Sequence, residues 1–238
     1  MNKYLSIVRL SCFSVLLCLC LARNANAQAT VINGSFETGD FTSWVVTDNT
    51  TPFDPFAVLP AGTPTAFFGF GGPNVVIPSD GTFAASNGFD GNAGTISIAQ
   101  DIGTIAFGDV LMFDYRAGWD LDTFSDATDS DRLFEVLIEP AGGGPPLTSI
   151  SLQTAMIGTD TFGGPNSDTG PLSAALNLSF FAGLSIRINF VWTIPDNFSG
   201  PANAQLDNVE FTNLLVPEPS SATFCLLGLT GMIARRRR

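Results

Sequence analysis

Five aspartates lie close together near the middle of the chain, at a spacing that could bind a hard cation or the hydroxyl groups of a sugar. They are Asp120, Asp122, Asp126, Asp129 and Asp131. The spacing starts like that of a calcium-binding EF-hand loop, but Phe124 stands at the third ligand position and no glycine follows it. We therefore expect a solvated acidic loop.

Trp119 directly precedes this cluster, and its indole could stack on a sugar ring while Asp120 and Asp122 accept hydroxyl hydrogen bonds. An aromatic residue at a strand position is more often part of the core than of a ligand platform. Glycan contact at these three residues is thus one of two interpretations, and packing in the core is the other.

The residue types that the chain lacks exclude most enzyme classes. There is no histidine, and the four cysteines, Cys12, Cys18, Cys20 and Cys225, all fall in apolar terminal runs. The central part therefore has no disulfide, no thiolate metal site, and neither Ser-His-Asp nor Cys-His catalysis. We predict that the chain is not an enzyme, with a glycoside hydrolase that uses two carboxylates as the remaining alternative.

The charges are distributed unevenly along the chain. Seven of the ten basic residues lie in the terminal segments, so residues 28–215 keep three arginines against 21 acids, a formal net charge of −18. Nucleic acids and anionic lipids need Lys or Arg to neutralise phosphate. We expect no nucleic-acid partner, and an acidic surface that keeps the domain soluble.

Short runs of alternating apolar residues, broken by Gly, Pro, Asn and Asp, predict an all-β domain. The clearest predicted strands are 95–102, 110–116, 133–139, 184–192 and 205–212. In the fourth, Leu184, Ile186, Ile188, Phe190 and Trp192 are predicted to share one face. Loops rich in glycine and proline separate the strands, as in a β-sandwich, and the abundant phenylalanine predicts an aromatic core.

Residues 1–27 have the three parts of a removable signal peptide. Lys3 and Arg9 precede an apolar run over 10–21, and Ala25-Asn26-Ala27 forms a small-x-small cleavage site. We predict a helix in this segment and cleavage before Gln28, with Ala25 and Ala27 recognised at the site. A permanent membrane helix is disfavoured, because the run has about 12 residues and a span needs about 20.

The other end, residues 216–238, has three features in a fixed order. Pro217, Glu218 and Pro219 are followed by an apolar run over 220–234 and then by Arg235, Arg236, Arg237 and Arg238. This order resembles the PEP-CTERM protein-sorting domain. The prolines favour an extended segment, and an arginine cluster stays on the cytoplasmic side of a membrane. The apolar run predicts a short helix of about 22 Å, less than the hydrocarbon thickness of about 30 Å.

The resemblance implies that an exosortase-type membrane transpeptidase cuts at or near the triplet. The chain would be anchored transiently in the inner membrane and then pass to the cell envelope or outside the cell. An ordinary tail anchor is the alternative interpretation of the same residues.

The predicted domain, residues 28–215, is similar at both ends to jelly-roll carbohydrate-binding modules with a galactose-binding-like fold. The opening resemblance lies in residues 33–39 with Phe41 and Trp44, and the closing one in Leu206 to Phe211. It implies a jelly-roll β-sandwich with a structural calcium ion, for which Glu37 and Asp207 match the two acidic ligands. Hard oxygen ligands such as these two carboxylates suit a calcium ion. Alternatively, Glu37 caps a turn and Asp207 bonds a loop amide.

Together these features predict an exported structural or interaction protein of the cell surface or extracellular matrix, associated with exopolysaccharide in a biofilm. A carbohydrate-binding module is the alternative function, and a carboxylate glycoside hydrolase is the second alternative.

Overall fold

The structure, a computed structural model, describes residues 29–50, 56–65, 75–87, 92–120, 131–155, 166–197 and 202–213. These ranges all belong to the predicted domain. The predicted signal peptide and sorting tail, with their two helices, lie outside the described residues. Within the described residues, the structure contains no helix with the length and hydropathy needed to cross a membrane.

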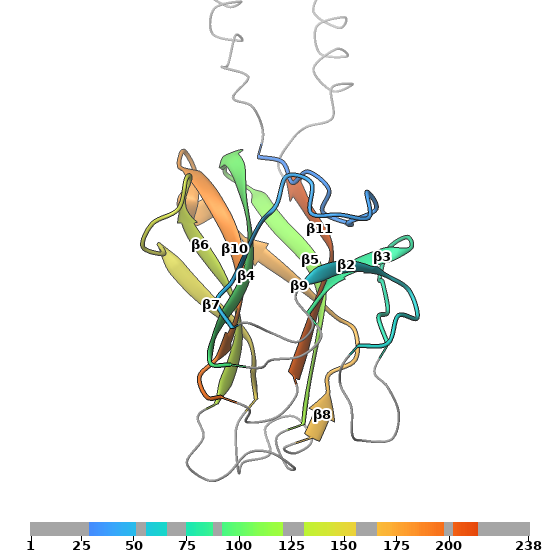
Figure 1. The fold of residues 1–238 in the computed structure, drawn as a ribbon. Coiled ribbons are helices and arrows are strands. Elements are labelled where there is room, and N and C mark those ends of the chain that lie inside the picture. The colour runs from blue at the N-terminus through green and yellow to red at the C-terminus, as the bar shows by residue number, and fades with distance from the viewer. Residues whose placement is uncertain are drawn as a thin grey trace, which may run out of the picture.

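Two antiparallel sheets pack face to face and form a sandwich (Figure 1). The first sheet has the order β1 (Val45–Asp48), β4 (Gly94–Thr104), β10 (Ser185–Ile194), β6 (Arg132–Pro140) and β7 (Thr148–Ala155). The second has the order β2 (Ala57–Pro60), β3 (Phe83–Ser86), β11 (Ala202–Asn213), β5 (Asp109–Asp120) and β8 (Asn166–Asp168). Strand β9 (Leu172–Asn177) also pairs with β5.

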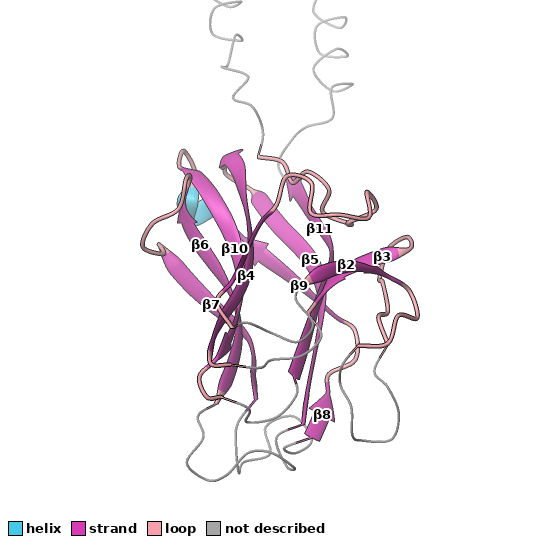
Figure 2. Ribbon diagram, in the orientation of Figure 1, coloured by secondary structure: helices cyan, strands magenta, loops and turns pink. Residues whose placement is uncertain are grey.

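Strands account for nearly all of the regular structure (Figure 2). The short 3-10 helix η1 (Ser179–Phe181) is the only helical element among the described residues. The predicted all-β jelly-roll sandwich is therefore confirmed, and the five predicted strands overlap the five longest strands, β4, β5, β6, β10 and β11.

Strand β10 shows why the alternating pattern predicts the fold. Ile186, Ile188, Phe190 and Trp192 are each at most 2% exposed, since alternate residues of a strand point to the same face. Leu184 departs from the prediction, because it lies one residue before β10 and is 48% exposed.

The core between the sheets is aromatic, as predicted. The rings of Phe113 and Phe190, from opposite sheets, lie 4.9 Å apart in an edge-to-face contact. Phe134 and Trp192 make a second edge-to-face contact at 5.6 Å. Such pairs contribute about 1 kcal/mol beyond the burial of their area.

The opening loop and the last strand meet, although they are far apart in sequence. The Val209 amide donates to the Gly34 carbonyl at 2.9 Å. A Cβ on Gly34 would lie 1.8 Å from the Val209 carbonyl oxygen, so only glycine allows this approach. A bulge between Asp207 and Glu210 includes Asn208 at φ 49°, and it turns the β11 backbone toward the loop.

Candidate binding face on the outer side of β11 and β5

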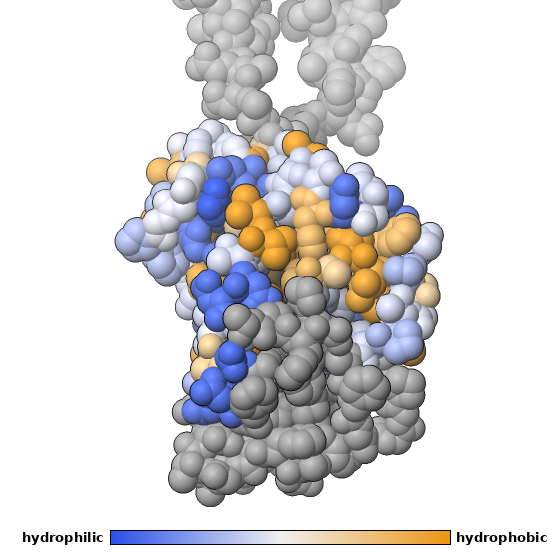
Figure 3. All heavy atoms as spheres, viewed as in Figure 1, coloured by the Kyte–Doolittle hydropathy of each residue, from blue (hydrophilic) through white to orange (hydrophobic). Residues whose placement is uncertain are grey.

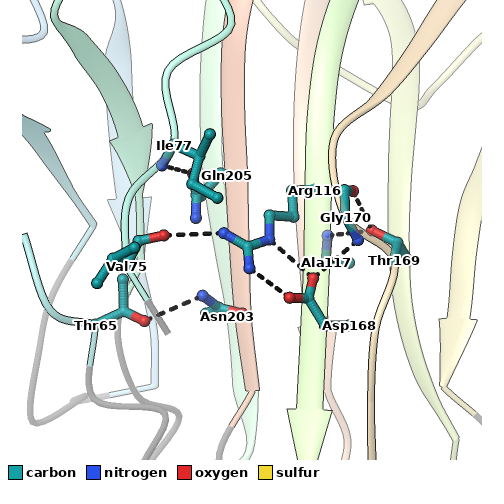
Figure 4. Close-up of polar contacts among 10 residues, drawn as sticks. All are labelled: Thr65, Val75, Ile77, Arg116, Ala117, Asp168, Thr169, Gly170, Asn203 and Gln205. Atoms are coloured by element: carbon teal, nitrogen blue, oxygen red, sulfur yellow. Dashed lines mark hydrogen bonds and ion pairs between the residues drawn. The ribbon is translucent and has the colours of Figure 1, made fainter. Parts of the chain in front are cut away.

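The outer face of the second sheet carries rows of polar side chains from β11 and β5. On β11, Ala204 and Leu206 enter the core, so Asn203, Gln205 and Asp207 point away from it. Gln205 pairs directly with Arg116, and Asp207 with Asp114. Figure 4 shows Arg116, Asn203 and Gln205 on this face, with Thr65, Val75 and Ile77 on one side and residues 168–170 on the other.

Arg116 links the two sides of this face. Its Nε donates to Asp168 Oδ1 at 2.8 Å, and a second guanidinium nitrogen pairs with Asp168 Oδ2. The remaining nitrogen donates to the Val75 carbonyl at 2.9 Å. Burial alone would raise the pKa of Asp168, but hydrogen bonds from Arg116 and from the Gly170 amide lower it below its usual value. The arginine thus holds both flanking segments against the sheet.

Two amides beside Arg116 keep unsatisfied polar atoms. Gln205 Oε1 accepts from the Ile77 amide at 3.1 Å, while its Nε2 has no partner. Asn203 Nδ2 donates to Thr65 Oγ1 at 3.3 Å, while its Oδ1 has none. Both residues are at most 3% exposed. Buried polar atoms usually have partners, so these two mark a place where water or a ligand would be stabilised.

Asp207 and Asp114 form the adjacent row. Asp207 Oδ2 accepts from the Ser79 and Asp80 amides at 2.7 and 3.0 Å, and Oδ1 from the Asn208 amide at 2.7 Å. Burial nevertheless raises the pKa of Asp207. Burial acts on Asp114 too, but hydrogen bonds from Ser173, Ser79 and Asn208 outweigh it and lower the pKa of that carboxyl. The fold therefore shifts the pKa values of these two neighbouring carboxyls in opposite directions.

A shallow hollow of about 10 Å³, open to solvent, lies over these rows. Its lining includes Ile77, Ser79, Asp114, Arg116, Gln205 and Asp207. Ligand pockets for small molecules usually measure about 300–1,000 Å³, so this hollow has room for about one water and for no ligand. Its carboxylates can accept hydroxyl hydrogens at the surface, while the buried Gln205 amide nitrogen can donate to a water in the hollow.

Glu37 and Asp207, the predicted calcium ligands, bind the same segment of chain. Glu37 Oε1 accepts from the Thr82 and Phe83 amides at 2.7 and 2.8 Å, just after the residues that bind Asp207. These contacts correspond to the alternative of a capped turn and a bonded loop amide. N–H groups that point at carboxylate oxygens do not suit a cation. No group of three acidic, histidine or cysteine side chains that could hold a metal ion occurs in the described ranges. Calcium at Glu37 and Asp207 stays a prediction.

Trp119, one of the three predicted glycan contacts, lies in the core and not on the surface. Trp119 is 1% exposed and belongs to the core cluster, so its indole is not available to stack on a sugar. That prediction was wrong because alternation along β5 turns the residue inward with Phe113 and Ala117. The side chain of Asp120 and all of Asp122 lie outside the described residues, as do Ala25, Ala27 and residues 217–219 and 235–238.

All three arginines of the domain are held by the fold. Arg116 and Arg132 are 7% and 1% exposed. Arg187 pairs with Asp101 at 2.7 Å, and this contact is the main cause of the lowered pKa of Asp101. None of the three presents an exposed, unpaired positive charge.

The C-terminal residues match a known protein family. The model of the PEP-CTERM protein-sorting motif matches residues 215–238. The chain carries a PEP-CTERM motif. This motif implies export, membrane anchoring and subsequent cleavage by an exosortase, which is the coarse fate predicted from the sequence. No curated protein matches the chain.

Solved structures of similar outline cover most of the chain at low identity. TmCBM61 in complex with β-1,4-galactotriose is 12% identical, with a TM-score of 0.46, and covers 77% of this chain and 97% of its own. The K3 cleaved adhesin domain of Lys-gingipain from Porphyromonas gingivalis W83 is 14% identical, with a TM-score of 0.43, and covers 78% of this chain and 100% of its own. The apo form of a cyclase from Fischerella sp. is 13% identical, with a TM-score of 0.43, and covers 77% of this chain and 96% of its own. Likeness at this level says nothing about the ligand of this chain.

Sequence reasoning missed the polar rows around Arg116 and Gln205. One signal was available, since the lone arginine of β5 stands at an outward position of a strand in a strongly acidic domain. The pairing of that strand with β11, which places Gln205 opposite Arg116, requires the sheet topology.

Proposed function

We propose that this chain is an exported, exosortase-processed protein whose β-sandwich acts at the cell surface or in the extracellular matrix as a non-catalytic interaction domain associated with exopolysaccharide. The observation that carries the proposal is the PEP-CTERM motif at residues 215–238, which determines a destination without requiring chemistry. The acidic domain without histidine or cysteine fits a structural or binding role.

Fractionation of the native host tests this proposal. Wild-type chain is expected to leave the inner membrane for the envelope or the medium, while a variant with Glu218→Ala accumulates in the inner membrane. Glu210→Ala, an exposed acid in the last strand, is the matched control and should behave as wild type. Equal release of the Glu218→Ala variant and the wild type would contradict the sorting role.

The hollow on the outer face favours glycan binding as a second candidate function. It combines carboxylate acceptors with a buried amide donor at Gln205 that a bound water would link to a ligand, and hydroxyl-rich ligands need both kinds of group. The hollow has room for about one water, so a sugar would lie over it and not inside it. An affinity built on few hydrogen bonds would be weak, and many copies in a matrix would increase it through multivalency.

A glycan array with the mature chain identifies the ligand, and one pair of variants locates it. Gln205→Leu is expected to weaken binding about fivefold, since one hydrogen bond contributes about 1 kcal/mol. Asn189→Leu, on the other sheet, is the matched control, because Asn189 also bonds only one partner, Glu139, and has a free amide oxygen. Equal loss in both variants would place the ligand elsewhere.

Release of reducing sugar by the purified chain would support the hydrolase alternative instead. Asp114 and Asp207 would be the carboxylates to substitute, because they lie opposite each other and their pKa values shift in opposite directions. Their backbone and side-chain hydrogen bonds, however, give both a structural role.

A further inference from the structure

Exposed apolar side chains gather at one end of the sandwich. Phe180 is 92% exposed, Phe107 69% and Leu184 48%. We name these three residues the apolar tip. Figure 3 shows apolar residues at the end of the sandwich where the described chain begins and ends. Large exposed aromatic side chains are costly in water, so an adjacent cluster of them indicates a partner surface.

Hydrogen bonds fix the apolar tip as one unit. The Gly108 amide donates to Ser179 Oγ at 3.0 Å, which joins the turn that carries Phe107 to η1, which carries Phe180. The Ile105 amide donates to the Leu184 carbonyl at 3.0 Å. Phe181 is 8% exposed and contacts Phe180 edge-to-face at 5.6 Å, so it anchors η1 to the core. The exposed rings therefore stand on a rigid base.

The last described residue lies directly beside this tip. Asn213 Nδ2 donates to the Phe107 carbonyl at 3.4 Å and to Asp109 Oδ1 at 2.5 Å. Ser220, where the apolar run of the sorting motif starts, is seven residues further along the chain. At about 3.5 Å per residue, the run begins at most about 25 Å from Asn213, which itself contacts Phe107. While the run is in a membrane, the tip is held close to the lipid headgroups.

The charge distribution also favours an orientation of the domain in which the apolar tip faces the membrane. Strands β5 and β6 reach the opposite end of the sandwich at Asp120 and Arg132, and the sequence between them is acidic. At the tip, Asp109 is 1% exposed and Asp101 is neutralised by Arg187. Anionic headgroups repel the acidic end much more strongly than the tip.

We propose that the apolar tip inserts into the outer leaflet of the inner membrane while the sorting motif anchors the chain, so that the domain stands on the bilayer through Phe107, Phe180 and Leu184. This rests on the proposed anchoring step. The contact holds the Pro217 to Pro219 triplet at the membrane surface, where a membrane-embedded transpeptidase acts, and cleavage releases it. A protein surface, such as that of the transpeptidase itself, is the competing occupant.

Site-specific fluorescence on the full chain tests the proposal. The domain has no cysteine, so after Cys225→Ser each variant Phe107→Cys, Phe180→Cys and Val45→Cys carries one polarity-sensitive label in the signal-cleaved protein. Val45 is 53% exposed on the edge strand β1 and is the matched control. The labelled chains are reconstituted through their tails into vesicles of phosphatidylethanolamine and phosphatidylglycerol, without transpeptidase.

Labels at positions 107 and 180 are expected to shift to shorter emission wavelengths and to be quenched by lipids with a nitroxide near the headgroup, while the label at 45 stays in water. Three equally water-exposed labels on chains that float with the vesicles would overturn the proposal. Shielding that occurs only after transpeptidase is added would also overturn it, in favour of a protein partner. Chains that fail to associate with vesicles at all would instead contradict the anchoring step.

Discussion

The carboxyls of the outer face differ in how folding changes their affinity for protons. Folding lowers the pKa of Asp114 and Asp168, through hydrogen bonds that outweigh burial, and raises the pKa of Asp207 through burial. Near pH 3.9 and below, Asp114 and Asp168 become protonated in the unfolded chain but stay ionised to a lower pH in the folded chain. Their stabilising contribution to the free energy of unfolding is therefore lost on acidification. Asp207 has the opposite effect on the free energy of unfolding, because as the pH falls it is protonated in the folded chain before it is protonated in the unfolded chain.

Two variants therefore change the acid stability curve in opposite directions. Asp168→Asn is expected to flatten the decrease in the free energy of unfolding below about pH 4. Asp207→Asn is expected to steepen the decrease above about pH 4, because folded Asp207 takes up its compensating proton above the pKa that it has in the unfolded chain. Urea unfolding between pH 2.5 and 6 measures both, and parallel curves for the two variants would show that the assigned shifts are wrong.

Arg116 is expected to contribute more to stability than Arg187. Arg116→Met leaves Asp168 without its cation and the Val75 carbonyl without its donor, at a cost of about 2 kcal/mol. Asp168 is 35% exposed, so solvent screening keeps this below the cost of breaking a fully buried pair. Arg187→Met at the exposed pair with Asp101 is the control, with an expected cost below about 1 kcal/mol. Equal costs in urea unfolding would contradict the buried role of Arg116.

Calcium titration distinguishes the two roles of Glu37 and Asp207. The hydrogen-bonded arrangement predicts the same melting temperature in EDTA and in excess calcium. A structural calcium ion, present at 100 times its dissociation constant, would add about 2.7 kcal/mol to the free energy of unfolding. Stabilisation that Glu37→Gln and Asp207→Asn each abolish would establish the metal site.

At the scale of elements, the close contact of the opening loop with β11 controls how the sandwich closes. Gly34→Ala is expected to cost about 3 kcal/mol or more, because the new methyl group would overlap the Val209 carbonyl. Gly62→Ala is the control, since its Cβ meets nothing within 4 Å and only the strain of φ +78° remains, about 1 kcal/mol. A smaller loss for Gly34→Ala than for Gly62→Ala would mean that the loop does not dock on β11.

Local alternation was enough to predict the five longest of the eleven described strands. It failed where a residue lies just outside a strand and where a function was inferred for a core position. Ile186 to Trp192 follow the period-two rule, whereas Leu184 belongs to the turn that pairs with Ile105. Of the two interpretations of Trp119, glycan contact was suggested by the acidic residues that follow it, but its own position in β5 points inward. The binding face depends on the pairing of β11 with β5, which no local pattern encodes.

At the scale of the whole molecule, the chain separates its tasks by region. The terminal segments contain 7 of the 10 basic residues and the sorting motif, while the acidic middle of the chain forms the β-sandwich. An acidic surface is expected to keep the domain soluble and away from anionic lipids. Under the proposed function, the same separation would let a domain of one charge sign be anchored in a membrane for a time and then leave it.

Intact-mass measurement of the mature protein, purified from its native host with and without the exosortase, tests this account most directly. With the transpeptidase present, the account predicts a chain that begins near Gln28 and ends near Pro217. Without it, the end should extend to Arg238. A mature protein that keeps both Met1 and Arg238 in the presence of the transpeptidase would contradict export and sorting together.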